Sequence, residues 1–181
     1  MSAVNPHQYK QDAEVLYSEE AVASAISTIA RALNADYQDE LPIVLSVMNG
    51  AAYFTGQLLP HLDFPLALDY VHATRYQGGI EGKAVRWIVE PKAEIKNRSV
   101  LILDDILDEG VTLKSVVDAC HALGAKQVKV AVLVDKALNK IKPITAEYIG
   151  ITVPNRYIFG CGMDVNGWWR NLPAIYALKT S

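Results

Sequence analysis

The chain has 181 residues, of which 51% are hydrophobic and 20% are charged, a composition typical of a globular protein with one substantial core. Its 17 Lys and Arg residues are outnumbered by 20 Asp and Glu residues, and the net charge of −3 argues against a surface dedicated to nucleic acid. No apolar run has the length of a membrane span, and Met1 to Tyr17 lacks the apolar centre of a signal peptide. Cys120 and Cys161 have no metal-binding spacing, so reduced thiols are expected. We expect one cytoplasmic domain, residues 1–181, without membrane or nucleic-acid partners.

The first half of the chain alternates between helical and strand patterns. Ser18 is a suitable N-cap, and the apolar residues from Val22 to Leu33 recur at helical spacing, which predicts an amphipathic helix that ends before Asp36. Further apolar stretches predict, in chain order, a strand, a helix and two strands, at 43–47, 53–62, 66–74 and 85–89. Residues 75–83 are polar and rich in glycine, and we expect this segment to be mobile.

The second half predicts a parallel sheet. Strand patterns occur at 100–103, 128–134, 148–151 and 157–159. Thr112 is predicted to cap a helix that Gly124 ends. The repeated strand–helix–strand order predicts an α/β fold, a mostly parallel sheet with helices on both faces. Ligands bind such sheets beyond the carboxyl ends of the strands, which are 48–51, 104–112 and 135–136 in this chain.

Three acids follow the apolar run at 100–103. Asp104 and Asp105 are adjacent, Asp108 comes three residues later, and Gly110 and Thr112 begin the next helix. Burying several carboxylates together is costly unless a ligand, a cation or a proton transfer uses them. The first two acids could accept hydrogen bonds from ribose hydroxyls, while the turn offers N–H groups to a phosphate and Asp108 serves as a general base. The alternative is a solvated acidic turn.

Residues 100–112 closely resemble the phosphoribosyl-pyrophosphate motif of type I phosphoribosyltransferases, and 104–112 is similar to the bacterial hypoxanthine-guanine branch. The resemblance extends from about Leu16 to Leu172. It implies a twisted, mostly parallel sheet with a small hood and a flexible hairpin loop. It also implies that Asp104 and Asp105 contact the ribose hydroxyls and that Asp108 is the base near purine N7. The residues implied to hold the ribose 5-phosphate are Asp108, Glu109, Gly110, Val111 and Thr112.

Met48-Asn49-Gly50-Ala51 resembles the pyrophosphate-binding loop of that family. The family often has Lys where Asn49 stands, so pyrophosphate is expected to depend more on Mg²⁺ and on Arg170. An unusual cis peptide of the family would correspond to Met48–Asn49. Without the resemblance, an ordinary Asn-Gly turn would be the simpler interpretation.

The base site is implied by three later residues. Lys136 matches the lysine that donates to the C6 oxygen of a 6-oxopurine, Tyr157 matches the aromatic residue that stacks on the base, and Ile158 meets its C2 side. The simpler interpretations are a solvated lysine and core packing.

The resemblance also implies metal and loop residues. Asp164, together with Asp104 and Asp105, is expected to bind Mg²⁺, although Asp164 could be an exposed turn acid. Arg75 and Tyr76 begin the expected flexible loop, where the family commonly has Ser-Tyr. His72 is interpreted as structural.

Together these features predict a purine salvage enzyme. It would transfer 5-phosphoribosyl from phosphoribosyl pyrophosphate to N9 of hypoxanthine or guanine, giving IMP or GMP and pyrophosphate. Mg²⁺ is the expected cofactor, and a homodimer or homotetramer is expected. The alternatives are a xanthine-guanine enzyme and a regulator that senses phosphoribosyl pyrophosphate without catalysis.

Overall fold

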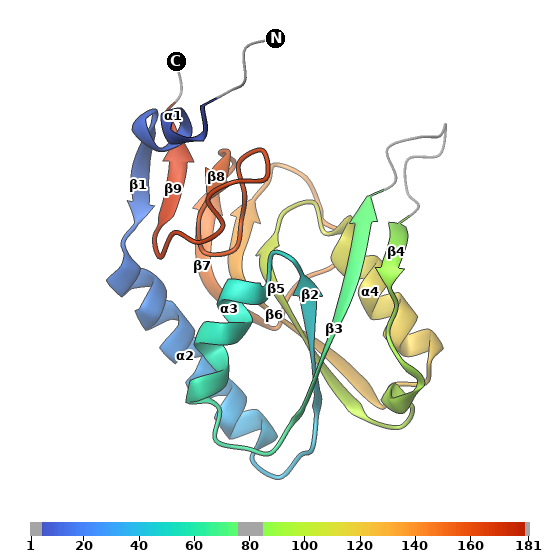
Figure 1. Cartoon of the computed structure of the whole chain (residues 1–181). Helices are drawn as coiled ribbons and strands as arrows, with labels where there is room; N and C mark the ends of the chain where they lie inside the picture. The colour runs from blue at the N-terminus through green and yellow to red at the C-terminus, as the bar shows by residue number, and fades with distance from the viewer. Residues whose placement is uncertain (1–4, 76–84, 180–181) are drawn as a thin grey trace.

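The structure is a computed structural model and describes residues 5–75 and 85–179. Its centre is a six-stranded sheet with the order β4-β3-β2-β5-β6-β7 (Figure 1). The bounds are β2 Ile43–Met48, β3 Ala67–Arg75, β4 Val85–Val89, β5 Ser99–Leu107, β6 Gln127–Ala137 and β7 Tyr148–Pro154. All neighbours pair in parallel except β4, which is an antiparallel edge strand. The predicted α/β class with a mostly parallel sheet is confirmed.

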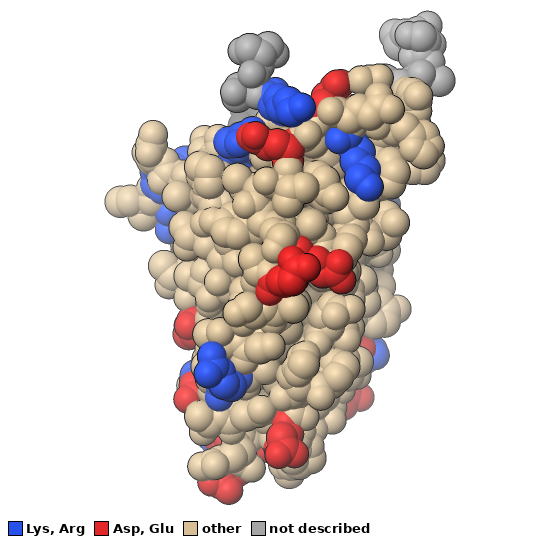
Figure 2. All heavy atoms as spheres, turned by 90° about the vertical axis from the view of Figure 1, so that its left-hand side faces the viewer, with Lys and Arg blue, Asp and Glu red and all other residues tan. Residues whose placement is uncertain are grey.

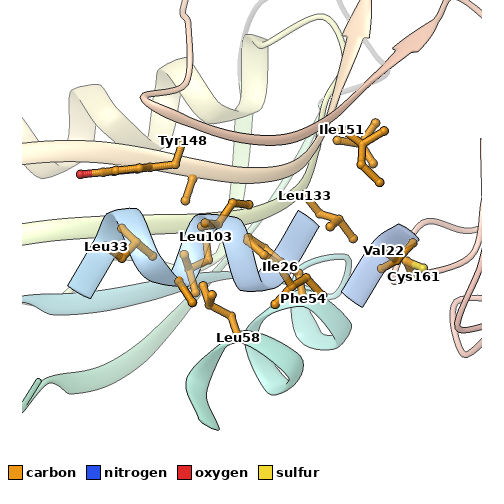
Figure 3. Packing of buried hydrophobic residues seen from close by; sticks show 14 of the residues in the cluster. Val22, Ile26, Leu33, Phe54, Leu58, Leu103, Leu133, Tyr148, Ile151 and Cys161 are labelled. Carbon is orange, nitrogen blue, oxygen red and sulfur yellow. The ribbon is translucent and has the colours of Figure 1, made fainter. Parts of the chain in front are cut away.

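Helices cover both faces of this sheet. Helices α2 (Glu19–Tyr37) and α3 (Ala52–Leu58) pack on one face, and α4 (Val111–Ala122) packs on the other. Figure 3 shows how Val22, Ile26 and Leu33 of α2 lie against residues of α3 and of the strands. These three side chains are at most 3% exposed, as the helical spacing of apolar residues in the sequence predicts. None of the described helices combines the length and apolar character that a membrane span requires.

A smaller antiparallel sheet lies beyond one end of the central sheet and forms the hood (Figure 1). Its order is β1-β9-β8, with β1 at Ala13–Tyr17, β9 at Ile175–Leu178 and β8 at Ile158–Phe159. A short helix, α1 (Pro6–Gln11), precedes β1, and the Trp169 indole donates to the Pro6 carbonyl oxygen at 2.6 Å. The hood therefore joins segments from both ends of the chain.

The structure corrects several predicted boundaries. Strand β5 continues to Leu107, because its pairing with β6 extends to Asp135. The first two acids consequently lie inside a strand rather than after one. Helix α4 begins at Val111 with Gly110 as its N-cap at φ +80°, so the predicted Thr112 cap is wrong. Helix α3 ends at Leu58 and gives way to the 3-10 turn Leu59–His61, because a proline in that turn lacks the N–H that a continuing helix needs.

Other boundaries also differ from the prediction, and one cannot be placed. Helix α2 continues past Asp36 to Tyr37, whose side chain is buried. Strand β8 begins at Ile158, so Tyr157 precedes it. A second 3-10 turn, Ala93–Ile95, comes between β4 and β5. Most of the predicted mobile segment at 75–83 lies outside the described residues, and that prediction stays open.

Candidate active site

A cavity of about 470 Å³ lies at the carboxyl ends of the central strands, beneath the hood. It brings together residues from the predicted pyrophosphate loop, the acidic turn, the base site and the segment around Asp164 and Arg170. The predicted site residues that line it are Met48, Asn49, Gly50, Asp104, Asp105, Asp108, Glu109, Gly110, Thr112, Lys136, Tyr157, Ile158, Asp164 and Arg170. Val111 is the one predicted site residue with a described side chain that does not line it.

Two buried carboxyl groups form the floor of the cavity. Asp104 is 8% exposed and Asp105 is 7% exposed, and the Asp105 N–H donates to Asp104 Oδ1 at 2.9 Å. Burial raises the pKa of Asp104 well above its usual range, and the negative charge of Asp105 adds to this effect. Burial also raises the pKa of Asp105, although the positive charge of Arg170 opposes part of the shift. The pair is therefore a site where a ligand or cation would be favourable.

Two glycines allow the backbone to approach Asp105 closely. A Cβ atom at Gly50 would lie 2.3 Å from Asp105 Oδ2, and one at Gly162 would lie 2.0 Å from the Gly50 carbonyl oxygen. The loop after β2 and the segment after β8 are thus packed against the carboxylate. The Met48–Asn49 peptide bond is cis, as the family resemblance implies.

Asp108 and Lys136 form a polar pair at the side of the cavity. The Lys136 ammonium donates to Asp108 Oδ2 at 2.8 Å, with the Lys136 side chain 12% exposed and that of Asp108 41% exposed. They stand just past β5 and near the end of β6, two neighbouring parallel strands. The pair therefore presents an ammonium donor and a carboxylate acceptor side by side.

The turn from β5 to α4 has the features of an anion site. Gly110 adopts φ +80°, and a Cβ atom there would lie 3.1 Å from the side chain of Ile144. The first N–H groups of the 12-residue helix α4 have no partner within the helix, and the helix dipole favours a negative charge at this end. Glu109 forms an ion pair with Lys140.

Residues just before β8 and in the segment between β8 and β9 supply the opposite wall. Tyr157 is 52% exposed, which leaves its ring accessible, and burial together with the nearby Asp164 raises the pKa of its hydroxyl. Asp164 pairs with Arg170 at 2.5 Å and accepts a hydrogen bond from the Gly167 N–H at 2.7 Å. Arg170 also donates to the Gly162 carbonyl oxygen at 2.7 Å. An aromatic ring, an acid and a guanidinium are therefore held above the strand ends.

Some residues of the site differ from the prediction or lie outside the description. Arg75 ends β3, but nothing is described of its side chain, and Tyr76 lies outside the described residues. His72, which the sequence predicts to be structural, lines the cavity, as does Thr74. Their place at the carboxyl end of a parallel strand is the signal that could have identified them. Within residues 5–75 and 85–179, no group of three or more His, Cys, Asp or Glu residues could hold a metal ion.

Known proteins resemble the chain over most of its length. Residues 12–166 match the phosphoribosyl transferase domain family. The hypoxanthine-guanine phosphoribosyltransferase of Lactococcus lactis is 34% identical, over 92% of this chain and 91% of that protein. The bifunctional protein TilS/HprT of Listeria innocua is 35% identical over 97% of this chain, which spans only 27% of that longer protein. The crystal structure of a hypoxanthine phosphoribosyltransferase from Staphylococcus aureus matches with a TM-score of 0.88 and 31% identity, covering 98% of this chain and 97% of that one. The chain therefore belongs to the phosphoribosyltransferase family.

Proposed function

We propose that the protein transfers a 5-phosphoribosyl group from phosphoribosyl pyrophosphate to N9 of hypoxanthine or guanine, giving IMP or GMP and pyrophosphate. The observation that carries this proposal is the pair of Asp108 and Lys136, whose polar atoms lie 2.8 Å apart in the wall of the cavity. A 6-oxopurine presents an oxygen at C6 and a nitrogen at N7 on one edge of its ring. Lys136 matches the oxygen because lysine only donates, and Asp108 matches a protonated N7.

The same pair disfavours adenine. Its C6 carries an amino group, which would place two hydrogen-bond donors opposite each other at Lys136. The exposed ring of Tyr157 supports stacking on the flat face of the base, and the buried Ile158 supports a backbone contact at its C2 side. These features favour a 6-oxopurine without ranking hypoxanthine against guanine.

The strand ends support binding of the ribose phosphate. Asp104 and Asp105 would accept hydrogen bonds from the ribose hydroxyls, a role in which buried carboxylates gain partners that offset their burial. The N–H groups from Asp108 to Thr112, at the start of α4, would hold the 5-phosphate. Val111 would contribute its backbone N–H alone, which agrees with its side chain lying outside the cavity lining.

The chemistry of the donors fits Mg²⁺. Carboxylate oxygens are preferred ligands, and Mg²⁺ in enzymes is commonly bound by one or two carboxylates together with substrate oxygens. Mg²⁺ would be held by Asp104 and Asp105 on the ribose side, or by Asp164 on the hood side, each time with substrate oxygens as further ligands, because no three of the described acids could hold one ion together. Bound there, it would neutralise the pyrophosphate leaving group. Arg170 and the loop Met48-Asn49-Gly50 would contact pyrophosphate, since all of them line the cavity.

The residues of this chain would then have separate roles in the reaction. Positive charge develops at the anomeric carbon as pyrophosphate departs, and Asp108 accepts the proton from N7 of the base. Lys136 stabilises the electron density that moves to the C6 oxygen. The segment that begins at Arg75 and Tyr76 would exclude water, which otherwise hydrolyses the activated ribose.

The test is an assay that depends on phosphoribosyl pyrophosphate, across hypoxanthine, guanine, xanthine and adenine. We expect nucleotide product with hypoxanthine and guanine. Efficient use of xanthine would favour the xanthine-guanine alternative, and activity with adenine alone would contradict the role of Lys136.

A regulator that senses phosphoribosyl pyrophosphate is the alternative from another class. Figure 2 shows the face around α1, β1 and α2, where Lys and Arg side chains are few and interspersed with Asp and Glu. This face has no broad basic patch among the residues that the structure describes, which agrees with the net charge of −3. No turnover with any base, together with tight and specific binding of RNA or DNA in a filter assay, would favour the regulator.

A further inference from the structure

Lys142 connects two strands close to the Asp108–Lys136 pair. It lies in the segment between β6 and β7, and its side chain is only 12% exposed. Its ammonium donates to the carbonyl oxygen of Leu107 at 2.7 Å and to Asp135 Oδ1 at 2.6 Å. Lys142 does not line the cavity, and the sequence offers no motif that would single it out.

The two acceptors immediately precede the two polar residues of the base site. Leu107 comes before Asp108, and Asp135 comes before Lys136. Leu107 and Asp135 are also directly paired in the register of β5 and β6. One partly buried ammonium therefore bridges the two strands at the last position where they pair.

Loss of this contact is expected to disturb the geometry of the Asp108–Lys136 pair. Hydrogen bonds from a charged donor are stronger than those between neutral groups, and a half-buried acid such as Asp135 would lose its ion-pair partner if Lys142 were removed. Reacting groups are sensitive to small displacements, since a shift of about 1 Å can reduce a rate by about a hundredfold. Asp108 lies beyond the end of β5, where the ladder with β6 no longer fixes its position.

We propose that Lys142 is a positioning residue, which holds Asp108 and Lys136 at the spacing that matches the N7 and C6 oxygen edge of the base. This proposal rests on the proposed function. Lys142 acts through the backbone of Leu107 and the carboxylate of Asp135, without touching the substrate.

The test compares Lys142→Met and Lys142→Arg with a matched control. Lys129 also makes two side-chain hydrogen bonds, to Asp36 at 2.9 Å and to Tyr148 at 3.1 Å, at the opposite end of β6. We expect Lys142→Met to lower kcat/KM for hypoxanthine at least about tenfold, within the cost of a misplaced reacting group. KM for phosphoribosyl pyrophosphate should change by less than about threefold, because α4 fixes the rest of the phosphate turn.

Rescue separates positioning from stability. Lys142→Arg restores a donor for both acceptors and should recover most of the activity. Lys129→Met should lower the melting temperature about as much as Lys142→Met does, but it should leave kcat/KM unchanged. Equal kinetic constants for Lys142→Met and the wild type, or the same loss in Lys129→Met, would overturn the proposal.

Two measurements keep the proposal distinct from failures of folding and of function. If Lys142→Met does not fold, Asp135→Asn removes the charge of one partner, and unchanged kcat/KM in that variant would contradict the proposal. An inactive wild type would refute the proposed function instead. In that case, a slowly exchanging ammonium signal of Lys136 in ¹⁵N-labelled protein decides whether the pair depends on Lys142: its loss in Lys142→Met supports the proposal, and its persistence overturns it.

Discussion

Carboxyl groups at the two ends of the central sheet differ in their partners and in the direction of their pKa shifts. At the amino end of β6, Lys129 donates to Asp36 and to Tyr148, and Tyr148 in turn donates to Asp36. These hydrogen bonds lower the pKa of Asp36. The bond from Tyr148 has the larger effect, and the bond from Lys129 has the next largest. At the carboxyl end of β5, burial raises the pKa of Asp104 and Asp105, which form no ion pair with any described residue.

This difference in pKa shift distinguishes carboxyl groups that stabilise the fold from carboxyl groups that are available to bind a ligand. A carboxyl group with a lowered pKa in the folded state stabilises the protein above its unfolded pKa, whereas one with a raised pKa opposes folding there. At neutral pH, Asp36 at the amino end therefore raises the free energy of unfolding, whereas Asp104 and Asp105 at the carboxyl end lower it. Such a cost at a strand end is expected where substrate or metal would supply the missing partners.

The largest expected effect comes from the carboxyl end. Asp108→Asn removes the proposed base and should lower kcat by roughly 10²–10⁴-fold, the usual contribution of general-base catalysis. Binding of phosphoribosyl pyrophosphate should change little, as isothermal titration would measure. Asp118→Asn is the control, because that side chain is 56% exposed and, among the residues that the structure describes, pairs with Lys114 alone on the outside of α4. Turnover of Asp108→Asn near the wild-type rate would exclude Asp108 from the mechanism.

A second variant tests the close packing around Asp105. Gly50→Ala places a Cβ atom 2.3 Å from Asp105 Oδ2, so the loop or the acid must move. We expect at least about a tenfold loss of kcat/KM and a loss of stability of about 1–3 kcal/mol, as for an overpacked core. Gly56→Ala is the matched control, since a Cβ atom there meets nothing within 4 Å. In helix α3 it should raise stability by roughly 0.5–1 kcal/mol. Equal behaviour of the two variants would show that the packing at Gly50 is unimportant.

A third variant tests whether the buried acids oppose folding. Because the folded-state pKa of Asp104 is raised, its destabilising effect is absent below the unfolded pKa of about 4 and appears as the pH rises through the folded value. Asp104→Asn should therefore raise Tm at pH 7, by about 2–4 °C for each ~1 kcal/mol gained, while activity falls. The gain should vanish near pH 4. A lower Tm at pH 7 in calorimetry would contradict the comparison between the two ends.

The smallest effect is expected at the amino end. Tyr148→Phe removes the hydroxyl that joins Asp36 and Lys129 and should reduce the free energy of unfolding by about 1 kcal/mol. Because the pKa of Asp36 is lowered in the folded state, the deficit should be present at pH 7 and shrink as the pH falls through that lowered pKa. Urea unfolding at pH 7, and again at a pH below the lowered pKa of Asp36, measures this change in the free energy of unfolding. Kinetic constants should not change, and a kinetic defect would show that the two ends are coupled.

The sequence predicted the central sheet well because its strands are continuous apolar runs and its site segments follow them. It did not reveal that Asp104 and Asp105 lie inside β5, since the strand continues only because β6 pairs with it. The hood was less predictable from local patterns. Strand β1 pairs with β9 across most of the chain, for example Ala13 with Leu178, and no local periodicity encodes such a pairing.

Side-chain partners show the same limit. The family resemblance placed Lys136 and Asp108 in one site, but only the fold reveals that they contact each other. Neither Lys142 nor His72 belongs to a recognisable motif. Lys142 is fixed by its bond to Asp135 of β6, and His72 by the pairing of β3 with β2. Spacing along the chain predicts elements, whereas contacts between elements depend on the register of the sheet.

The arrangement of the hood has a consequence for the order of events during synthesis. Strand β9 is the middle strand of the hood sheet, with β1 on one side and β8 on the other, yet it is the last strand along the chain. As a chain emerges from the ribosome, the six strands of the central sheet are complete before β9 exists. The hood sheet that carries Ile158 can form only afterwards, so the wall of the cavity above the strand ends is assembled last.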